Sequence, residues 1–181
     1  MELLVVITII GILAAMVFPV ANGVLRRARK AQAKNDALQV RQAIETYFTE
    51  YRKFPVKVTG GGGNVQDMRL ETDETLMDVL MGSKKAVDSG MNTRRITFFS
   101  GKKATGNPPK AGVVMDGTSG GGELFDPWGE YFQVVLDTSR NDRVADPTTP
   151  GVENIPQSVI IWSKGVNTED EDGEGDDIAT W

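Results

Sequence analysis

The chain has 181 residues, 20 of them basic and 25 acidic, and it contains neither histidine nor cysteine. This length suits one modest domain with an attached element. Without cysteine and histidine the chain has no thiol nucleophile, disulfide framework, Cys/His zinc site or imidazole general base. Residues 169–177 hold seven of the carboxylates, and without these the net charge of −5 would become +2. The basic residues cluster only after the first apolar run, with no aromatic side chains among them, so we expect no nucleic-acid partner.

The first segment, residues 1–25, is apolar and predicts a membrane-spanning helix. Residues 3–25 are 23 consecutive residues without a charge. A helix of this length would measure ~34 Å, enough to cross the hydrocarbon core of a bilayer. A cleaved secretory signal would have a basic region first and a shorter apolar core. A buried core helix is a third alternative, for which a domain of this size has little room.

Two residues of this segment are unusual for a simple membrane anchor. Glu2 is an acid at the expected membrane edge, where it can lie among the lipid headgroups. Pro19 removes a helical hydrogen bond, so it predicts a kink or a local loss of helix.

The second segment, residues 26–54, continues the helix and gives it one buried face. Its apolar residues recur at alternating steps of three and four, which is the spacing of an amphipathic helix. We expect one helix from Glu2 to about Lys53, ~78 Å long, because Phe54 precedes a proline and so disfavours the helical conformation. The apolar stripe consists of Ala37, Val40, Ile44, Tyr47 and Tyr51.

The third segment, residues 55–181, predicts a small α+β region with long loops. A helix is expected over Glu71–Met81, stopped by Gly82. The glycine run Gly60–Gly63 lacks the Lys-Ser/Thr of a phosphate loop and predicts a flexible connection. Strands are expected where β-branched and aromatic runs are bounded by turn-forming residues. These runs are Val56–Val58, Arg95–Phe99, Ala111–Met115, Tyr131–Asp137 and Ser158–Trp162.

The N-terminal motif over residues 2–15, ELLVVITIIGILAA, resembles that of type IV pilins and type II secretion pseudopilins. The resemblance implies that Glu2 pairs with the N-terminal amine of a neighbouring subunit in a polymer, and that Pro19 is the helix-breaking proline of the family. It also implies cleavage by prepilin peptidase and N-methylation of the new terminus. Met1 stands where the family has its fourth mature residue, so neither modification can be placed on a residue of this sequence.

Two arguments about orientation in the membrane disagree. The basic cluster between Arg26 and Lys34 follows the apolar run, and the positive-inside rule would therefore place the rest of the chain in the cytoplasm. The resemblance implies the opposite arrangement: a basic leader in the cytoplasm, a single-pass helix in the bacterial inner membrane and a periplasmic C-terminal region. We follow the resemblance, because the leader is the segment that the rule would count.

A four-residue turn motif lies between two expected strands. Asp126, Pro127, Trp128 and Gly129 predict a type I turn, which favours proline second and glycine fourth. The turn also resembles the DPWG motif of the major pseudopilin of type II secretion, where that motif leads into the small sheet.

The C-terminal segment, residues 163–181, is acidic and punctuated by glycines. Seven acids among nine residues are most often a disordered tail. However, the segment directly follows an expected strand and ends in Ile178 and Trp181 rather than in polar residues. It also resembles the C-terminal calcium loop of major pseudopilins, which implies a structural calcium site.

The resemblance also implies which residues of this loop bind the ion. Calcium takes about 6–8 oxygen ligands from carboxylates, side-chain amides and backbone carbonyls. The ligands implied are Asp176, Asp177 and Asn167, with Asp170 or Asp172 as a replacement for Asn167.

Together these features predict an α+β, pilin-like fold in which a long N-terminal helix packs against a small antiparallel sheet. The resemblance implies a structural subunit, not an enzyme, of a pseudopilus that polymerises through its N-terminal helix and drives folded proteins out through an outer-membrane channel. The implied partners are copies of this chain, other pseudopilins, inner-membrane secretion proteins and the membrane, with prepilin peptidase as a further partner if an upstream leader exists. A type IV pilin or minor pseudopilin is the first alternative. An anchored calcium-dependent binding module, or a hydrolase that uses paired carboxylates, is the alternative from another class.

Overall fold

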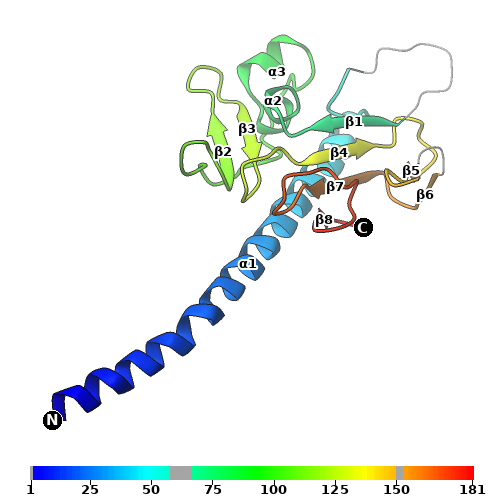
Figure 1. Cartoon of the computed structure of the whole chain (residues 1–181). Coiled ribbons are helices and arrows are strands. Elements are labelled where there is room, and N and C mark those ends of the chain that lie inside the picture. The colour runs from blue at the N-terminus through cyan, green and yellow to red at the C-terminus, as the bar shows by residue number, and fades with distance from the viewer. Residues whose placement is uncertain (1, 58–66, 150–152) are drawn as a thin grey trace.

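The computed structural model describes the backbone of residues 2–57, 67–149 and 153–181, and the side chains of these residues except 2, 14–22, 153 and 154. The fold is α+β, with a long N-terminal helix and a small antiparallel sheet, as the sequence predicts (Figure 1). The elements are α1 (Glu2–Tyr51), β1 (Met68–Glu71), α2 (Glu74–Met81), α3 (Lys84–Asp88), β2 (Gly112–Met115), β3 (Gly122–Phe125), β4 (Gln133–Leu136), β5 (Val144–Ala145), β6 (Glu153–Ile155), β7 (Val159–Ser163) and β8 (Ile178–Ala179).

Helix α1 has two parts with different surroundings. Its N-terminal part projects away from the globular part (Figure 1), and the described side chains of residues 3–31 are exposed. From Ala33 onward, one face of α1 is buried against the sheet. The predicted stripe is confirmed, since Ala37, Val40, Ile44 and Tyr47 are fully buried. The helix ends at Tyr51, within two residues of the predicted end.

The four-stranded sheet has the order β1-β4-β7-β8, and every neighbouring pair is antiparallel. Its central strands β4 and β7 are buried on both faces, which explains their continuous apolar sequences. One face packs on α1 and the other is covered by the β5–β6 pair. Residues facing α1 include Val134, Leu136, Val159 and Ile161, while Val135, Ile160 and Trp162 face the opposite side.

Helix α2 starts later than the sequence predicts. Asp73 caps its N-terminus by accepting a hydrogen bond from the backbone N–H of Leu76, and the residues before the cap form strand β1 instead. The predicted end is confirmed: Gly82 adopts a left-handed conformation with φ 71°, which suits glycine.

Two predicted strands are not strands in the structure. The segment Arg95–Phe99 has no strand pairing, because the N–H groups of Phe98 and Phe99 donate to the carbonyl of Leu80 in α2. Val56 and Lys57 are also irregular, while Val58 and the Gly60–Gly63 run lie outside the described residues.

The expectation of a membrane-spanning half is not supported by the described residues. Among them, no helix contains a stretch that is both long and apolar enough to cross a membrane.

Candidate functional site

The two residues expected to act in assembly both lie on α1. Glu2 is its first residue, and the backbone stays helical through Pro19. Of the two effects predicted for Pro19, a local loss of helix does not occur, and a kink stays a prediction. The side chains of both residues lie outside the described part of the structure, so their roles stay predictions.

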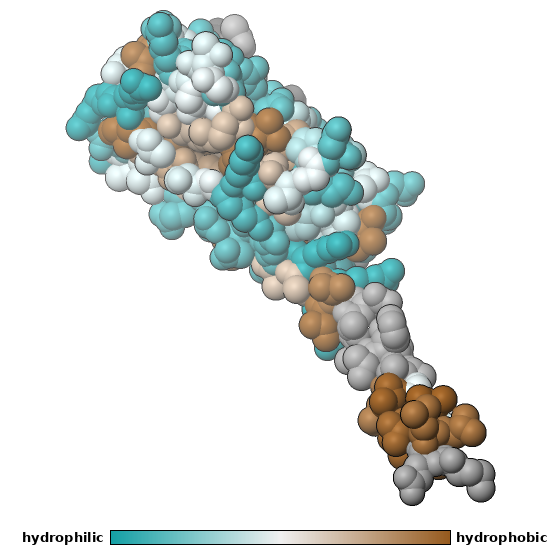
Figure 2. Space-filling model, turned by 90° about the vertical axis from the view of Figure 1, so that its left-hand side faces the viewer, coloured by the Kyte–Doolittle hydropathy of each residue, from teal (hydrophilic) through white to brown (hydrophobic). Residues whose placement is uncertain are grey.

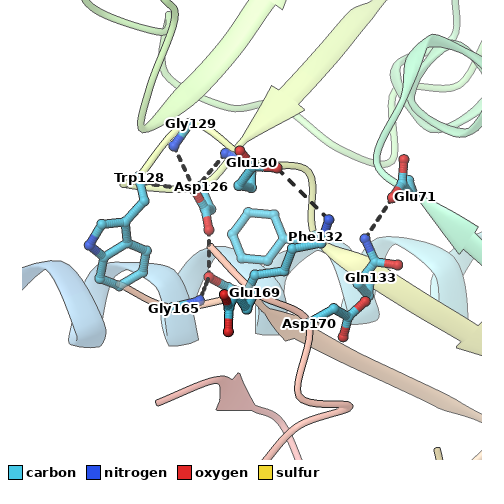
Figure 3. Close-up of polar contacts among 12 residues, drawn as sticks. Glu71, Asp126, Trp128, Gly129, Glu130, Phe132, Gln133, Gly165, Glu169 and Asp170 are labelled. Atoms are coloured by element: carbon cyan, nitrogen blue, oxygen red, sulfur yellow. Dashed lines mark hydrogen bonds and ion pairs between the residues drawn. The ribbon is translucent and has the colours of Figure 1, made fainter. Parts of the chain in front are cut away.

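The predicted turn is confirmed and is organised by a buried carboxylate. The N–H of Gly129 donates to the carbonyl of Asp126 at 3.2 Å, which closes the turn. Asp126 is fully buried, and its Oδ1 accepts from the N–H groups of Trp128, Gly129 and Glu130 at 2.8, 2.8 and 3.0 Å (Figure 3). One carboxylate oxygen therefore satisfies three backbone donors.

The other oxygen of this carboxylate joins the turn to the C-terminal loop. Asp126 Oδ2 accepts from the hydroxyl of Ser163 at 2.6 Å, and Ser163 Oγ accepts from the N–H of Gly165 at 3.3 Å. Figure 3 shows Gly165 beside Asp126, although they lie on separate loops. Ser163 ends β7, so the turn and the start of the loop are fixed relative to each other.

The C-terminal segment is a folded loop and not a disordered tail. Strand β8 returns along β7, with Ser163 opposite Ile178. Trp181 packs edge-on against Trp162, with ring centroids 5.6 Å apart. Gly173 has φ +93°, and a Cβ there would meet the Trp181 ring, so the bend requires glycine.

The adjacent residues Asp176 and Asp177 stabilise the loop by accepting hydrogen bonds from its backbone. Asp176 Oδ2 accepts from the N–H groups of Val166 and Asn167 at 2.5 and 3.2 Å. Asp177 Oδ2 accepts from the N–H groups of Glu171 and Gly173 at 3.1 and 2.9 Å. These hydrogen bonds connect the start and the middle of the loop to the residues just before β8.

Asp177 also has an oxygen without a partner. Its Oδ1 is buried and has no hydrogen-bond partner in the structure. Burial raises the pKa of Asp177, and the nearby charges of Asp170 and Glu171 raise it further, while the two backbone N–H groups oppose the increase. A cation at this oxygen would supply the missing interaction.

The replacement ligands Asp170 and Asp172 are paired with Arg69 of β1 instead. Arg69 Nη2 lies 2.5 Å from Asp170 Oδ2, and Nη1 lies 2.8 Å from Asp172 Oδ1. The indole N–H of Trp162 donates to Asp170 Oδ1 at 2.9 Å, so both oxygens of this aspartate are occupied. The guanidinium of Arg69 also lies over the Trp162 ring, 4.8 Å from its centroid.

The structure therefore places the expected calcium ligands in one loop, but their oxygens are not gathered around a common ion position. Asn167 Oδ1 accepts from the N–H of Glu169 at 2.8 Å. In the described residues, which include all of 163–181, no three carboxylates are grouped so that they could hold a metal ion. Sequence reasoning missed Arg69, which carries no signal of its own because it lies in a distant segment.

A second group of acids bears on the hydrolase alternative. Glu45, Asp137 and Asp142 line a cavity of about 250 Å³. Asp137 is buried, and its oxygens accept from Ser139 Oγ and from the N–H groups of Asn141 and Asp142 at 2.7, 3.3 and 2.7 Å. Because these bonds occupy both oxygens, Asp137 organises its own turn, and the geometry does not favour a general acid–base pair there.

Comparisons of the chain with protein-family models, with curated proteins and with solved structures find no match. The features that bear on function are therefore the N-terminal motif, the turn at 126–129, the exposed apolar part of α1 and the acidic C-terminal loop.

Proposed function

We propose that this protein is a structural subunit of a type II secretion pseudopilus and polymerises through the first half of α1. The observation that carries the proposal is the exposed apolar part of this helix. Figure 2 shows these hydrophobic residues projecting away from a largely hydrophilic globular part. The large exposed side chains are Leu3, Leu4, Val5, Val6, Ile7, Ile9, Ile10, Ile12 and Leu13, followed by Val24 and Leu25.

Such a surface needs an apolar partner. Leu3 to Leu13 contribute nine large side chains that are 53–76% exposed. Burying them would contribute on the order of 10 kcal/mol, at about 1 kcal/mol for each partly exposed side chain. A bilayer before assembly and neighbouring helices afterwards would both supply this burial. We therefore place the subunit in the bacterial inner membrane as a single-pass protein with a periplasmic C-terminal region.

The proposed partners follow from this location and from the motif. The polymer consists of copies of this chain with other pseudopilins, and inner-membrane secretion proteins assemble it. If an upstream leader exists, prepilin peptidase is the enzyme that removes it. The turn at 126–129 favours secretion over a type IV pilin.

Calcium is the proposed structural cofactor of the C-terminal loop. The unpartnered Oδ1 of Asp177 supports a cation there, and Asp176 and Asn167 are the expected ligands that form no ion pair with Arg69. The ion would supply positive charge among carboxylates that otherwise repel each other. Asp170 and Asp172 could join only by leaving Arg69.

Replacing Glu2 by Ala in the full-length precursor tests the assembly role. If Glu2 pairs with a neighbouring subunit, the variant should be inserted and folded but should assemble pseudopili slowly or not at all. Asp88→Ala, an exposed acid in α3, is the control and should assemble normally. Electron microscopy and cross-linking measure assembly, and wild-type assembly of the Glu2 variant would contradict the role.

Removing residues 1–25 tests the membrane role. Among the described side chains of α1, Ala33 is the first that is buried, so residues 26–181 retain all of the described core and should fold alone. This fragment should be a monomer that a high-salt wash releases from membranes, as measured by fractionation and sedimentation. Retention after the wash would show attachment through the globular part.

Thermal unfolding of the 26–181 fragment tests calcium binding. An ion at about 100 times its dissociation constant should add about 2.7 kcal/mol, which raises the melting temperature by roughly 5–10 °C for a domain of this size. Asp176→Ala and Asp177→Ala should abolish the increase, and Asp88→Ala should keep it. If calcium and chelator gave the same melting temperature in the parent fragment, the site would be refuted.

A further inference from the structure

A basic surface lies on α1 at the junction between its exposed apolar part and the globular part. Five of its residues follow Leu25 directly on the helix, and their side chains are exposed. Three more lie on the loop before β2 and are also exposed. The basic collar consists of Arg26, Arg27, Arg29, Lys30 and Lys34 of α1 with Lys102, Lys103 and Lys110 of the loop.

The three lysines belong to one compact loop. Thr105 and Lys110 pair as in a hairpin, and Lys103 forms a bridge with Val113 at the start of β2. This pairing holds Lys102, Lys103 and Lys110 together.

The loop lies at the end of the globular part that faces the apolar half of α1. Lys102 is close enough to Asp36 to lower the pKa of its carboxyl, although burial is the larger effect and raises it. Asp36 lies within one turn of Ala33, the first residue of the helix whose described side chain is buried. Arg29 precedes Asp36 by seven residues, which places it on the same helix face about 10 Å closer to the apolar part.

The collar has little compensating charge. Within the part of the chain that the structure describes, none of its eight basic residues forms an ion pair with a carboxylate. Asp36 is the single acid among residues 26–44. Other basic residues do form ion pairs, among them Arg69 with Asp170 and Lys85 with Asp116.

We propose that the collar binds anionic phospholipid headgroups and holds the globular part against the membrane surface before assembly. This rests on the proposed membrane location of the apolar half of α1. If Leu25 lies at the edge of the hydrocarbon, Arg26 to Lys30 lie within about 8 Å of it along the helix, among the headgroups. Lys34 and Lys102 lie about 14–16 Å from it, within roughly one Debye length of the headgroup surface. Continuity between the apolar and basic surfaces therefore favours a lipid surface as the partner.

Binding of the 26–181 fragment to vesicles tests the collar without the apolar anchor. At about 0.15 M salt, the fragment should bind vesicles of equal parts phosphatidylcholine and phosphatidylglycerol, and should not bind phosphatidylcholine alone. Each basic residue close to an anionic surface contributes about fivefold in affinity. A variant that combines four helix substitutions should therefore bind at least 100-fold more weakly. These are Arg26→Gln, Arg27→Gln, Arg29→Gln and Lys30→Gln. A second variant combines three loop substitutions and should bind at least threefold more weakly, since these lysines lie farther from the lipid surface. They are Lys102→Gln, Lys103→Gln and Lys110→Gln.

A charge-matched control removes four basic residues at the opposite end of the globular part. Arg94 pairs there with Glu50, close to the end of α1. The fourfold control combines Arg52→Gln, Lys84→Gln, Arg94→Gln and Arg95→Gln, and it should bind the anionic vesicles as the parent does.

The outcomes separate the collar from the membrane anchor. Equal binding of the parent fragment to both vesicle types, or equal weakening by the collar and control variants, would overturn the collar. The collar proposal would also be overturned if the fragment associated with itself without vesicles, in a salt-sensitive way that the collar variants lose. The partner of the collar would then be the acidic loop of a second copy, not a lipid surface. The full chain should also insert into phosphatidylcholine alone, and failure there would refute the membrane location, not the collar.

Discussion

Replacing Asp126 by Ala should cost more stability than any other single change in the turn. The substitution removes a buried acceptor of four hydrogen bonds: three from backbone N–H groups and one from the hydroxyl of Ser163. Hydrogen bonds to a charged group contribute about 1.5–3 kcal/mol each, but these share two oxygens and are not additive. We therefore expect a loss of about 3–5 kcal/mol in the free energy of unfolding.

Urea unfolding of the 26–181 fragment measures this loss, and Asp116→Ala is the matched control. Asp116 also accepts from a backbone N–H and a hydroxyl, in the turn formed by Thr118 and Ser119. Asp116 is partly exposed, so water can replace its hydrogen bonds, and its ion pair with the exposed Lys85 contributes little. The free energy of unfolding should therefore fall much less in Asp116→Ala than in Asp126→Ala. Asp126→Asn keeps the shape and an acceptor oxygen, so it should retain most of the stability. Equal losses for Asp126→Ala and Asp116→Ala would refute the central role of the buried carboxylate.

Three further changes test the loop and the core. Without calcium, Arg69→Ala should lower the free energy of unfolding by about 1 kcal/mol. The same change frees Asp170 and Asp172, so it should tighten calcium binding roughly twofold to fivefold, as measured by calorimetry; weaker binding would contradict competition between Arg69 and calcium for these aspartates. Gly173→Ala forces a Cβ against Trp181 and should cost about 2 kcal/mol, whereas Gly117→Ala, with open space around it, should cost little in the same urea titration. Burial raises the pKa of the Asp78 carboxyl, so the folded state binds the proton of this carboxyl more tightly than the unfolded state does. The stability of the parent fragment should therefore fall as pH rises from about 4. Asp78→Asn cannot ionise, so its melting temperature relative to that of the parent should increase between about pH 4 and pH 7, and a constant difference would contradict this.

Elements with a strong repeating pattern could be predicted from the sequence. The buried stripe of α1 needs only the three-four spacing, since one helix face must meet the core. Strands β2, β4 and β7 are rich in β-branched residues, and all of their ends agree with the predictions to within two residues.

Elements whose local preference is weak or overridden could not be predicted. Strand β1 contains no β-branched residue and forms because β4 pairs with it. The segment Arg95–Phe99 has strong β propensity, yet the amide of Asn92 donates to the carbonyl of Ile96, and its own carbonyl oxygen accepts from Ile96 N–H. Tertiary contacts decide both cases.

The same division holds for the candidate site. The turn at Asp126 is local, so its residue types predict it. The partner of the acidic loop is not local: Arg69 lies about 100 residues earlier in the chain and reaches Asp170 and Asp172 only because β1 and β7 flank β4 in the same sheet.

Arg69 also changes what a calcium ion would contribute. Its guanidinium already satisfies Asp172 and one oxygen of Asp170, so this side of the loop can close without metal. The other side cannot do so fully, because Asp177 Oδ1 is buried without a partner. Calcium at Asp176 and Asp177 would therefore complete a loop that Arg69 already half closes. The ion should then raise the stability of β8 and Trp181 most, and the rest of the sheet should depend on it little.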